Sequence, residues 1–70
     1  MQISARNVIK GKITKIVEGP VSTEVTIKVG PKVDIVSSIT TTAAHSLGLE
    51  KGMEAYAVIK ATSVMVGVEH

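Results

Sequence analysis

Alternation of apolar and polar residues over the first 40 positions predicts three β-strands. Residues 8–18 place Ile9, Ile13 and Val17 on one parity and lysines on the other, as a strand with one buried face does. Residues 21–29 alternate most regularly, and their predicted inward set is Val21, Thr23, Val25, Ile27 and Val29. Residues 33–39 give a third strand, with the inward set Val33, Ile35, Ser37 and Ile39.

Glycine and proline divide these runs. Gly19-Pro20 and Gly30-Pro31 mark turns, so the first two strands are expected to form a hairpin. Gly11 lies on the inward parity of the first strand. A glycine there predicts a sharp bend or a close approach of another backbone, as a small barrel requires.

Residues 40–47 break the alternation and predict a helix of about two turns. Thr40 or Thr41 can cap its amino end, and Gly48 stands where a helix stops in the left-handed conformation. Such a short helix is unstable alone, so it must close one end of a larger structure. Its free amide groups could receive a small anion, although an ordinary capped helix facing water fits the same pattern.

The last stretch, residues 55–68, is almost entirely apolar and rich in β-branched residues, and it predicts buried sheet. Lys60 is the exception within it. A buried ammonium group needs an anionic partner, unless the side chain reaches solvent at a strand edge. Ser63 and a bulge at Ala61-Thr62 could add donors beside the lysine.

Together the elements predict one domain over residues 1–70 that is all-β: a five-stranded barrel of the oligonucleotide/oligosaccharide-binding (OB) type, with one short helix after the third strand. A core of 70 residues is marginal, and the absence of cysteine removes disulfides and thiolate metal sites. The sequence is 44% hydrophobic with one aromatic ring, Tyr56, which favours self-association. No apolar run reaches the roughly 18 residues of a membrane span, so we expect a soluble, cytoplasmic protein.

Several segments together resemble the molbindin (Mop) family. They are Ser4-Ala5-Arg6-Asn7, Gly11, Ser38-Ile39-Thr40 before the short helix, Leu47-Gly48-Leu49, and the run from Ala57 to Val66 that contains Ile59-Lys60-Ala61-Thr62-Ser63. The resemblance covers essentially the whole chain in register. It implies OB-like barrels that exchange strands to form dimers, assemble as a hexamer (a trimer of dimers), and hold molybdate or tungstate between subunits.

The resemblance also implies a ligand set. Ser4 and Arg6 of one chain would face Lys60 and Ser63 of another, with Thr40 and the Ala43 amide completing the shell. The full implied set for the oxyanion is Ser4, Ala5, Arg6, Thr40, Ala43, Lys60, Ala61 and Ser63. A second kind of anion site is expected near the three-fold axis, and the turn residues Gly19, Val21 and Ser22 are the candidates for it.

The chemistry of the side chains agrees with this ligand. A tetrahedral oxyanion offers only acceptors, and every polar side chain in the set is a donor. Arginine supplies a rigid fork and lysine a point charge, while hydroxyls and amides fix distances. The function implied is non-catalytic storage or buffering of molybdate or tungstate, with no cofactor and no metal held directly by side chains.

Three other functions compete. A nucleic-acid-binding OB domain would stack bases on exposed rings, but Tyr56 is the only ring and lies on a strand predicted to be buried. An enzyme or a metal site would need acidic partners near His45 or His70, and none stands at suitable spacing. A purely structural oligomer with an incidental cationic pocket is compatible with the sequence. The formal net charge of +2 is too small to indicate a nucleic-acid footprint.

Overall fold

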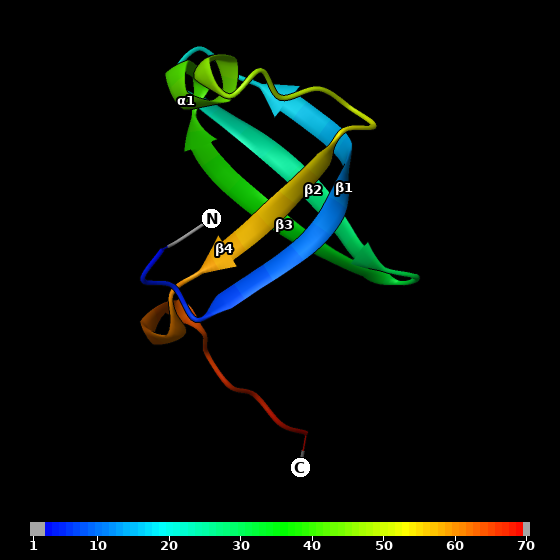
Figure 1. The fold of residues 1–70 in the computed structure, drawn as a ribbon, viewed down its shortest axis with the longest axis vertical. Helices are drawn as coiled ribbons and strands as arrows, with labels where there is room; N and C mark the ends of the chain where they lie inside the picture. Colours follow the sequence, from blue (N-terminus) through cyan, green and yellow to red (C-terminus); the bar gives the residue numbers. More distant parts are fainter. Residues whose placement is uncertain (1–2, 70) are drawn as a thin grey trace.

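A four-stranded antiparallel sheet curls into a half-barrel in the computed structural model, which describes residues 3–69 (Figure 1). The strands are β1 (Asn7–Glu18), β2 (Ser22–Gly30), β3 (Val33–Thr40) and β4 (Glu54–Ile59), in the order β3-β2-β1-β4. The helix α1 (Thr41–Ser46) follows β3, and a single 3-10 turn, η1 (Ala61–Ser63), follows β4. The predicted all-β class, the β1–β2 hairpin and the helix after the third strand are therefore confirmed.

Strand β1 is shared between two neighbours. Its amino half pairs with β4, from Asn7↔Ile59 to Lys12↔Glu54, and its carboxyl half pairs with β2. Gly11 lies just before the point of exchange. A Cβ atom there would stand 2.6 Å from the carbonyl oxygen of Lys28 and 2.7 Å from a methyl of Ile27. The predicted close backbone approach is present, and it is what lets β1 bend around the core.

The core is small and lies inside the curl of the sheet. Its fully enclosed residues are Ile13, Val25, Ile27, Ala44 and Ala57, with Thr23 as the one buried polar side chain of the described residues. The inward parity predicted for β2 is confirmed from Thr23 to Val29. Val21 lies outside the strand and is exposed.

Of the residues predicted to face inward from β1, only Ile13 is buried, and Ile9 and Val17 are exposed. A register shift between Ile13 and Lys15 exchanges the two faces of the strand, so that even-numbered Ile16 packs on the core while Val17 is exposed. A β-bulge adds one residue to one strand, and with a side-chain period of two this exchanges the faces. In β3, Ile35 and Ile39 pack on the core as predicted, but Val33 is exposed.

The helix begins and ends where its capping residues stand. Thr40 is the N-cap and accepts a hydrogen bond at its side-chain oxygen from the Ala43 amide at 3.0 Å. Gly48 adopts φ +63° just beyond the helix, the left-handed conformation that favours glycine. Ala44 turns into the core, so the helix covers one end of the half-barrel, as Figure 1 shows.

The prediction of a fifth strand is not met in this chain. Strand β4 ends at Ile59, η1 turns the chain, and residues 64–69 project away from the sheet without a strand partner (Figure 1). Met65 and Val66 are 94% and 90% exposed. An extended segment becomes a strand only when another backbone pairs with it, and β1, the neighbour of β4, begins only at Asn7.

Lys60 accordingly lies outside the sheet, as the residue preceding η1, and it is exposed. Of the two options for Lys60, the structure has the side chain in solvent, just past the end of β4. The prediction that the apolar run continues as buried sheet is wrong. Tyr56, also expected to be buried, is 51% exposed. None of the helices in residues 3–69 has the length and apolar character needed to cross a bilayer.

Candidate functional site

A polar cavity of about 280 Å³ lies where the chain enters β1 and leaves β4. The pairing of Asn7 with Ile59 places the residues before β1 beside those after β4. Donor-bearing side chains from both ends of the sequence therefore meet in one place. The residues lining the cavity are Ser4, Arg6, Lys60, Ala61 and Thr62.

Hydrogen bonds of the backbone shape this cavity. The side-chain amide of Asn7 donates to the Ile59 carbonyl at 3.3 Å, immediately before Lys60. In η1, the Ser63 amide donates to the Lys60 carbonyl at 2.9 Å. The amides of Ala61 and Thr62 precede that bond, so the turn itself gives them no partner.

The cavity carries positive charge and no negative charge on its lining side chains. It is lined by a guanidinium, an ammonium and hydroxyl groups, and none of its lining residues carries a carboxylate. Arg6 and Lys60 are exposed and form no ion pair within residues 3–69. Nor do three His, Asp or Glu side chains cluster within these residues to hold a metal ion. The arrangement suits an anion that offers only acceptor oxygens.

Four of the eight residues in the predicted ligand set line this cavity: Ser4, Arg6, Lys60 and Ala61. Ala5 and Ser63 flank these residues in the chain but do not line it, and Thr62 lines it without having been predicted. The sequence signal for Thr62 was the break at Ala61-Thr62 beside Lys60, which was predicted as a bulge and is a 3-10 turn in the structure. The family resemblance assigns Ser4 and Arg6 to one chain and Lys60 and Ser63 to another. Within this single chain, the β1–β4 pairing already places Ser4, Arg6 and Lys60 around one cavity.

Thr40 and Ala43 lie at the far end of the half-barrel. Thr40 pairs with Ser22, beside the carboxyl end of β1, whereas the cavity lies at its amino end (Figure 1). The 12 residues of β1 separate the two places, on the order of 30 Å of strand. The Ala43 amide is already bonded to the Thr40 side-chain oxygen, and that oxygen keeps its own hydroxyl proton as a donor.

The candidate second site, residues 19–22, lies against α1. The Gly19 amide donates to the Ser22 carbonyl at 3.0 Å, which closes the turn, and the Thr41 amide donates to the Val21 carbonyl at 2.8 Å. Val21 and Ser22 are exposed. The structure brings Gly19, Val21 and Ser22 together with each other and with α1, not with the donor-lined cavity.

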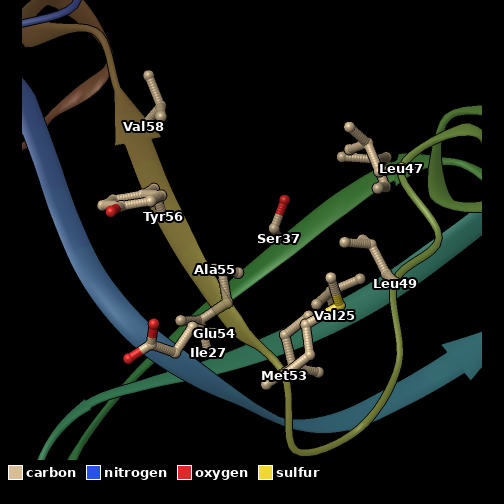
Figure 2. A pocket seen from close by; sticks show the side chains of 12 residues that line it. Val25, Ile27, Ser37, Leu47, Leu49, Met53, Glu54, Ala55, Tyr56 and Val58 are labelled. Atoms are coloured by element: carbon tan, nitrogen blue, oxygen red, sulfur yellow. The ribbon is translucent and has the colours of Figure 1, made fainter. Parts of the chain in front are cut away.

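A second, larger cavity of about 360 Å³ is apolar and opens between β4 and the loop after α1. Figure 2 shows apolar side chains on both sides of this groove and the Ser37 hydroxyl between them. Tyr56 and Val58 form its β4 edge. Leu47, Leu49 and Met53 lie on the opposite side. The open edge of the half-barrel is therefore an apolar surface.

Comparison with known proteins gives consistent matches over the whole chain. The model of the TOBE domain matches residues 3–66. A probable molybdenum-pterin-binding protein of Haemophilus influenzae is 52% identical over 69 residues, which are 99% of this chain and 100% of that protein.

Two solved structures share the fold as well as the sequence. MopII from Clostridium pasteurianum is 37% identical with a TM-score of 0.89, and the match covers 96% of this chain and all of that one. The cytoplasmic molybdate-binding protein ModG, solved with molybdate bound, is 40% identical with a TM-score of 0.92. That match covers 99% of this chain but 49% of ModG.

Proposed function

The chain belongs to the TOBE-domain family, and from that premise we propose that it is a non-catalytic protein that binds molybdate and stores or buffers it. The expected relation to the molbindin (Mop) family is confirmed by near full-length matches to molybdenum-pterin-binding proteins. The observation that carries the proposal is the cavity that Ser4, Arg6 and Lys60 line, in which every side-chain polar group can donate and no lining residue carries a carboxylate.

The donor set favours the bare oxyanion over a pterin. A bicyclic pterin stacks best on a large aromatic ring, and Tyr56, the only Phe, Tyr or Trp residue of the sequence, lines the apolar groove rather than the donor-lined cavity. Molybdate has four acceptor oxygens and two negative charges, which Arg6 and Lys60 would balance. Hydroxyls and amides at fixed positions would then select the anion by size. Tungstate satisfies the same requirements and is an alternative ligand.

The donors at the two ends of β1 cannot reach one anion within one chain. We propose that Ser4, Arg6, Lys60 and Ala61 of one copy are completed by Thr40 of a second copy, whose α1 end would lie against the cavity. The backbone of Ala5, Ala43 and Ser63 would hold these ligand residues in position. This division differs from the one that the resemblance implies only in placing Arg6 and Lys60 on the same chain, and it keeps the site between subunits.

The apolar groove supports a dimer formed by strand exchange. Residues 64–68 are extended, apolar and unpaired within the described chain, and the groove is an open apolar surface at the edge of the sheet. The tail of a second copy laid along this edge would supply the fifth strand of each barrel. Three such dimers would give the hexamer that the family resemblance implies.

The remaining assignments rest on the same resemblance. The turn residues Gly19, Val21 and Ser22 would form the second anion site, where exposed turns of several copies meet. We place the protein in the cytoplasm, since the relative ModG is described as cytoplasmic.

The test of this function is equilibrium dialysis of the full chain with molybdate at neutral pH, with sulfate in parallel. We expect molybdate uptake near one ion per shared site, a rise of Tm with molybdate and little effect of sulfate. No uptake of molybdate would overturn the proposal.

The same experiment tests the division between chains. Lys60→Ala and Thr40→Val each damage every shared site of their own oligomer. When the two variants are unfolded and refolded together, mixed dimers contain one site with both Lys60 and Thr40 intact. We expect uptake to return in the mixture but in neither variant alone. A mixture that binds no more than its components would contradict a site shared by two chains.

A further inference from the structure

Three oxygen atoms form a chain behind the Thr40 end of the molecule. The Thr41 hydroxyl donates to the Gly19 carbonyl at 2.6 Å, and the hydroxyls of Thr23 and Thr41 are 2.7 Å apart. A carbonyl only accepts, and a hydroxyl has one proton. The proton between the two threonines therefore belongs to Thr23, and the direction of the whole chain is fixed.

Burial holds this arrangement in place. Thr23 is fully enclosed, with 0% of its surface exposed, so its hydroxyl has no water to turn to. It depends on Thr41 as its acceptor, and leaving a buried donor unsatisfied is costly. The branched side chain of Thr41 also has few rotamers. Thr41 is thus constrained from both sides of its hydroxyl.

The main chain and the side chain of Thr41 both donate hydrogen bonds to the same turn. Its amide donates to the Val21 carbonyl at 2.8 Å, while its hydroxyl donates to the Gly19 carbonyl. The peptide that joins Thr40 to Thr41 is therefore anchored to residues 19–22. Thr40 lies on the other side of this peptide, and its side-chain oxygen accepts a hydrogen bond from the Ala43 amide.

We propose that Thr41 is a positioning residue for the oxyanion: it touches no ligand but fixes the Thr40 hydroxyl, and with it the turn at residues 19–22, in the geometry that the bound anion requires. This inference rests on the proposed function, in which Thr40 completes the shell. The Thr41 hydroxyl, which lies inside the protein, would thus align the uncharged donor of the site, the Thr40 hydroxyl.

The experiment compares molybdate affinity, by isothermal titration of the full chain, in wild type, Thr41→Val and Thr41→Ser. The valine keeps the shape of threonine without the hydroxyl, and the serine restores the hydroxyl. We expect about tenfold weaker binding for T41V and a return to within about threefold of wild type for T41S. Thr26→Val on β2 is the matched control, since no side-chain hydrogen bond of Thr26 occurs among residues 3–69, and its affinity should stay within about twofold.

Loss of the fold is separated from loss of alignment by a double variant. T23V/T41V removes the buried Thr23 donor together with its acceptor, so the core keeps no unpaired hydroxyl, and only the half-buried Gly19 carbonyl loses a partner, as it also does in T41V. We expect it to fold and still to bind about tenfold more weakly. Wild-type affinity in both T41V and the double variant would overturn the inference alone. A wild-type chain that takes up no molybdate would overturn the proposed function and this inference with it.

Discussion

At the Asn7 end of β1 the donors are charged and exposed, whereas at the Glu18 end they are neutral hydroxyls held by hydrogen bonds. Arg6 and Lys60 have long side chains and no ion-pair partner in residues 3–69. Thr40 and Thr41 are short and bonded within the fold. The charged end suits attraction of an anion from solution, and the neutral end suits discrimination by distance. The difference indicates a division of labour between the two halves of one proposed site.

The largest effect should come from giving the neutral end a charge. Thr40→Asp keeps an N-cap oxygen for the Ala43 amide, and aspartate caps helices at least as well as threonine. We expect an unchanged or higher Tm without ligand, but a loss of molybdate affinity of at least about a hundredfold from repulsion between like charges. Calorimetry and equilibrium dialysis measure the two quantities separately.

Thr40→Ser is the control for this change, because it keeps both the cap and the hydroxyl. Its affinity should stay within about threefold of wild type. Normal molybdate uptake by T40D would remove Thr40 from the shell, and the comparison between two halves of one site would then fail.

A smaller effect is expected at the charged end. Arg6→Gln or Lys60→Gln removes one charge but keeps a polar side chain, and hydrogen bonds to charged groups contribute about 1.5–3 kcal/mol. We expect about 10- to 100-fold weaker molybdate binding for each variant, with the loss shrinking as salt is raised. Lys32→Gln removes the same charge from the turn between β2 and β3 and should bind as wild type does. Equal losses in all three variants would indicate that only net charge matters.

The sequence was sufficient for most elements because their signals are local. The alternation in β2, the cap at Thr40 and the stop at Gly48 each depend on neighbouring residues, and all three are present in the structure. The face of β1 was not predictable beyond Ile13, since a bulge is decided by pairing with β2 and leaves no mark in the alternation.

The errors around Lys60 have a different physical cause. The apolar run at residues 55–68 has strand composition throughout, but only residues up to Ile59 find a partner backbone in this chain. Composition indicates that a segment should be buried; it does not indicate whether its partner belongs to the same chain. For the same reason, sequence cannot decide how the proposed site is divided between chains, although four residues of the predicted ligand set line one cavity.

The smallest effect should follow removal of the exposed contact at the neutral end. His45 Nε2 lies 2.8 Å from Glu18 Oε1, where it also joins α1 to the end of β1, but both side chains are more than half exposed. Exposed pairs contribute little, because water and salt screen them. We expect His45→Ala to change Tm by less than about 4 °C and molybdate affinity by less than about twofold. Molybdate titration of H45A and T41V in parallel would decide which contact aligns Thr40. A tenfold loss of affinity in H45A with none in T41V would assign the alignment to the exposed His45–Glu18 pair. The reverse would assign it to the buried Thr23 and Thr41 hydroxyls, since Thr23 has no alternative partner in water.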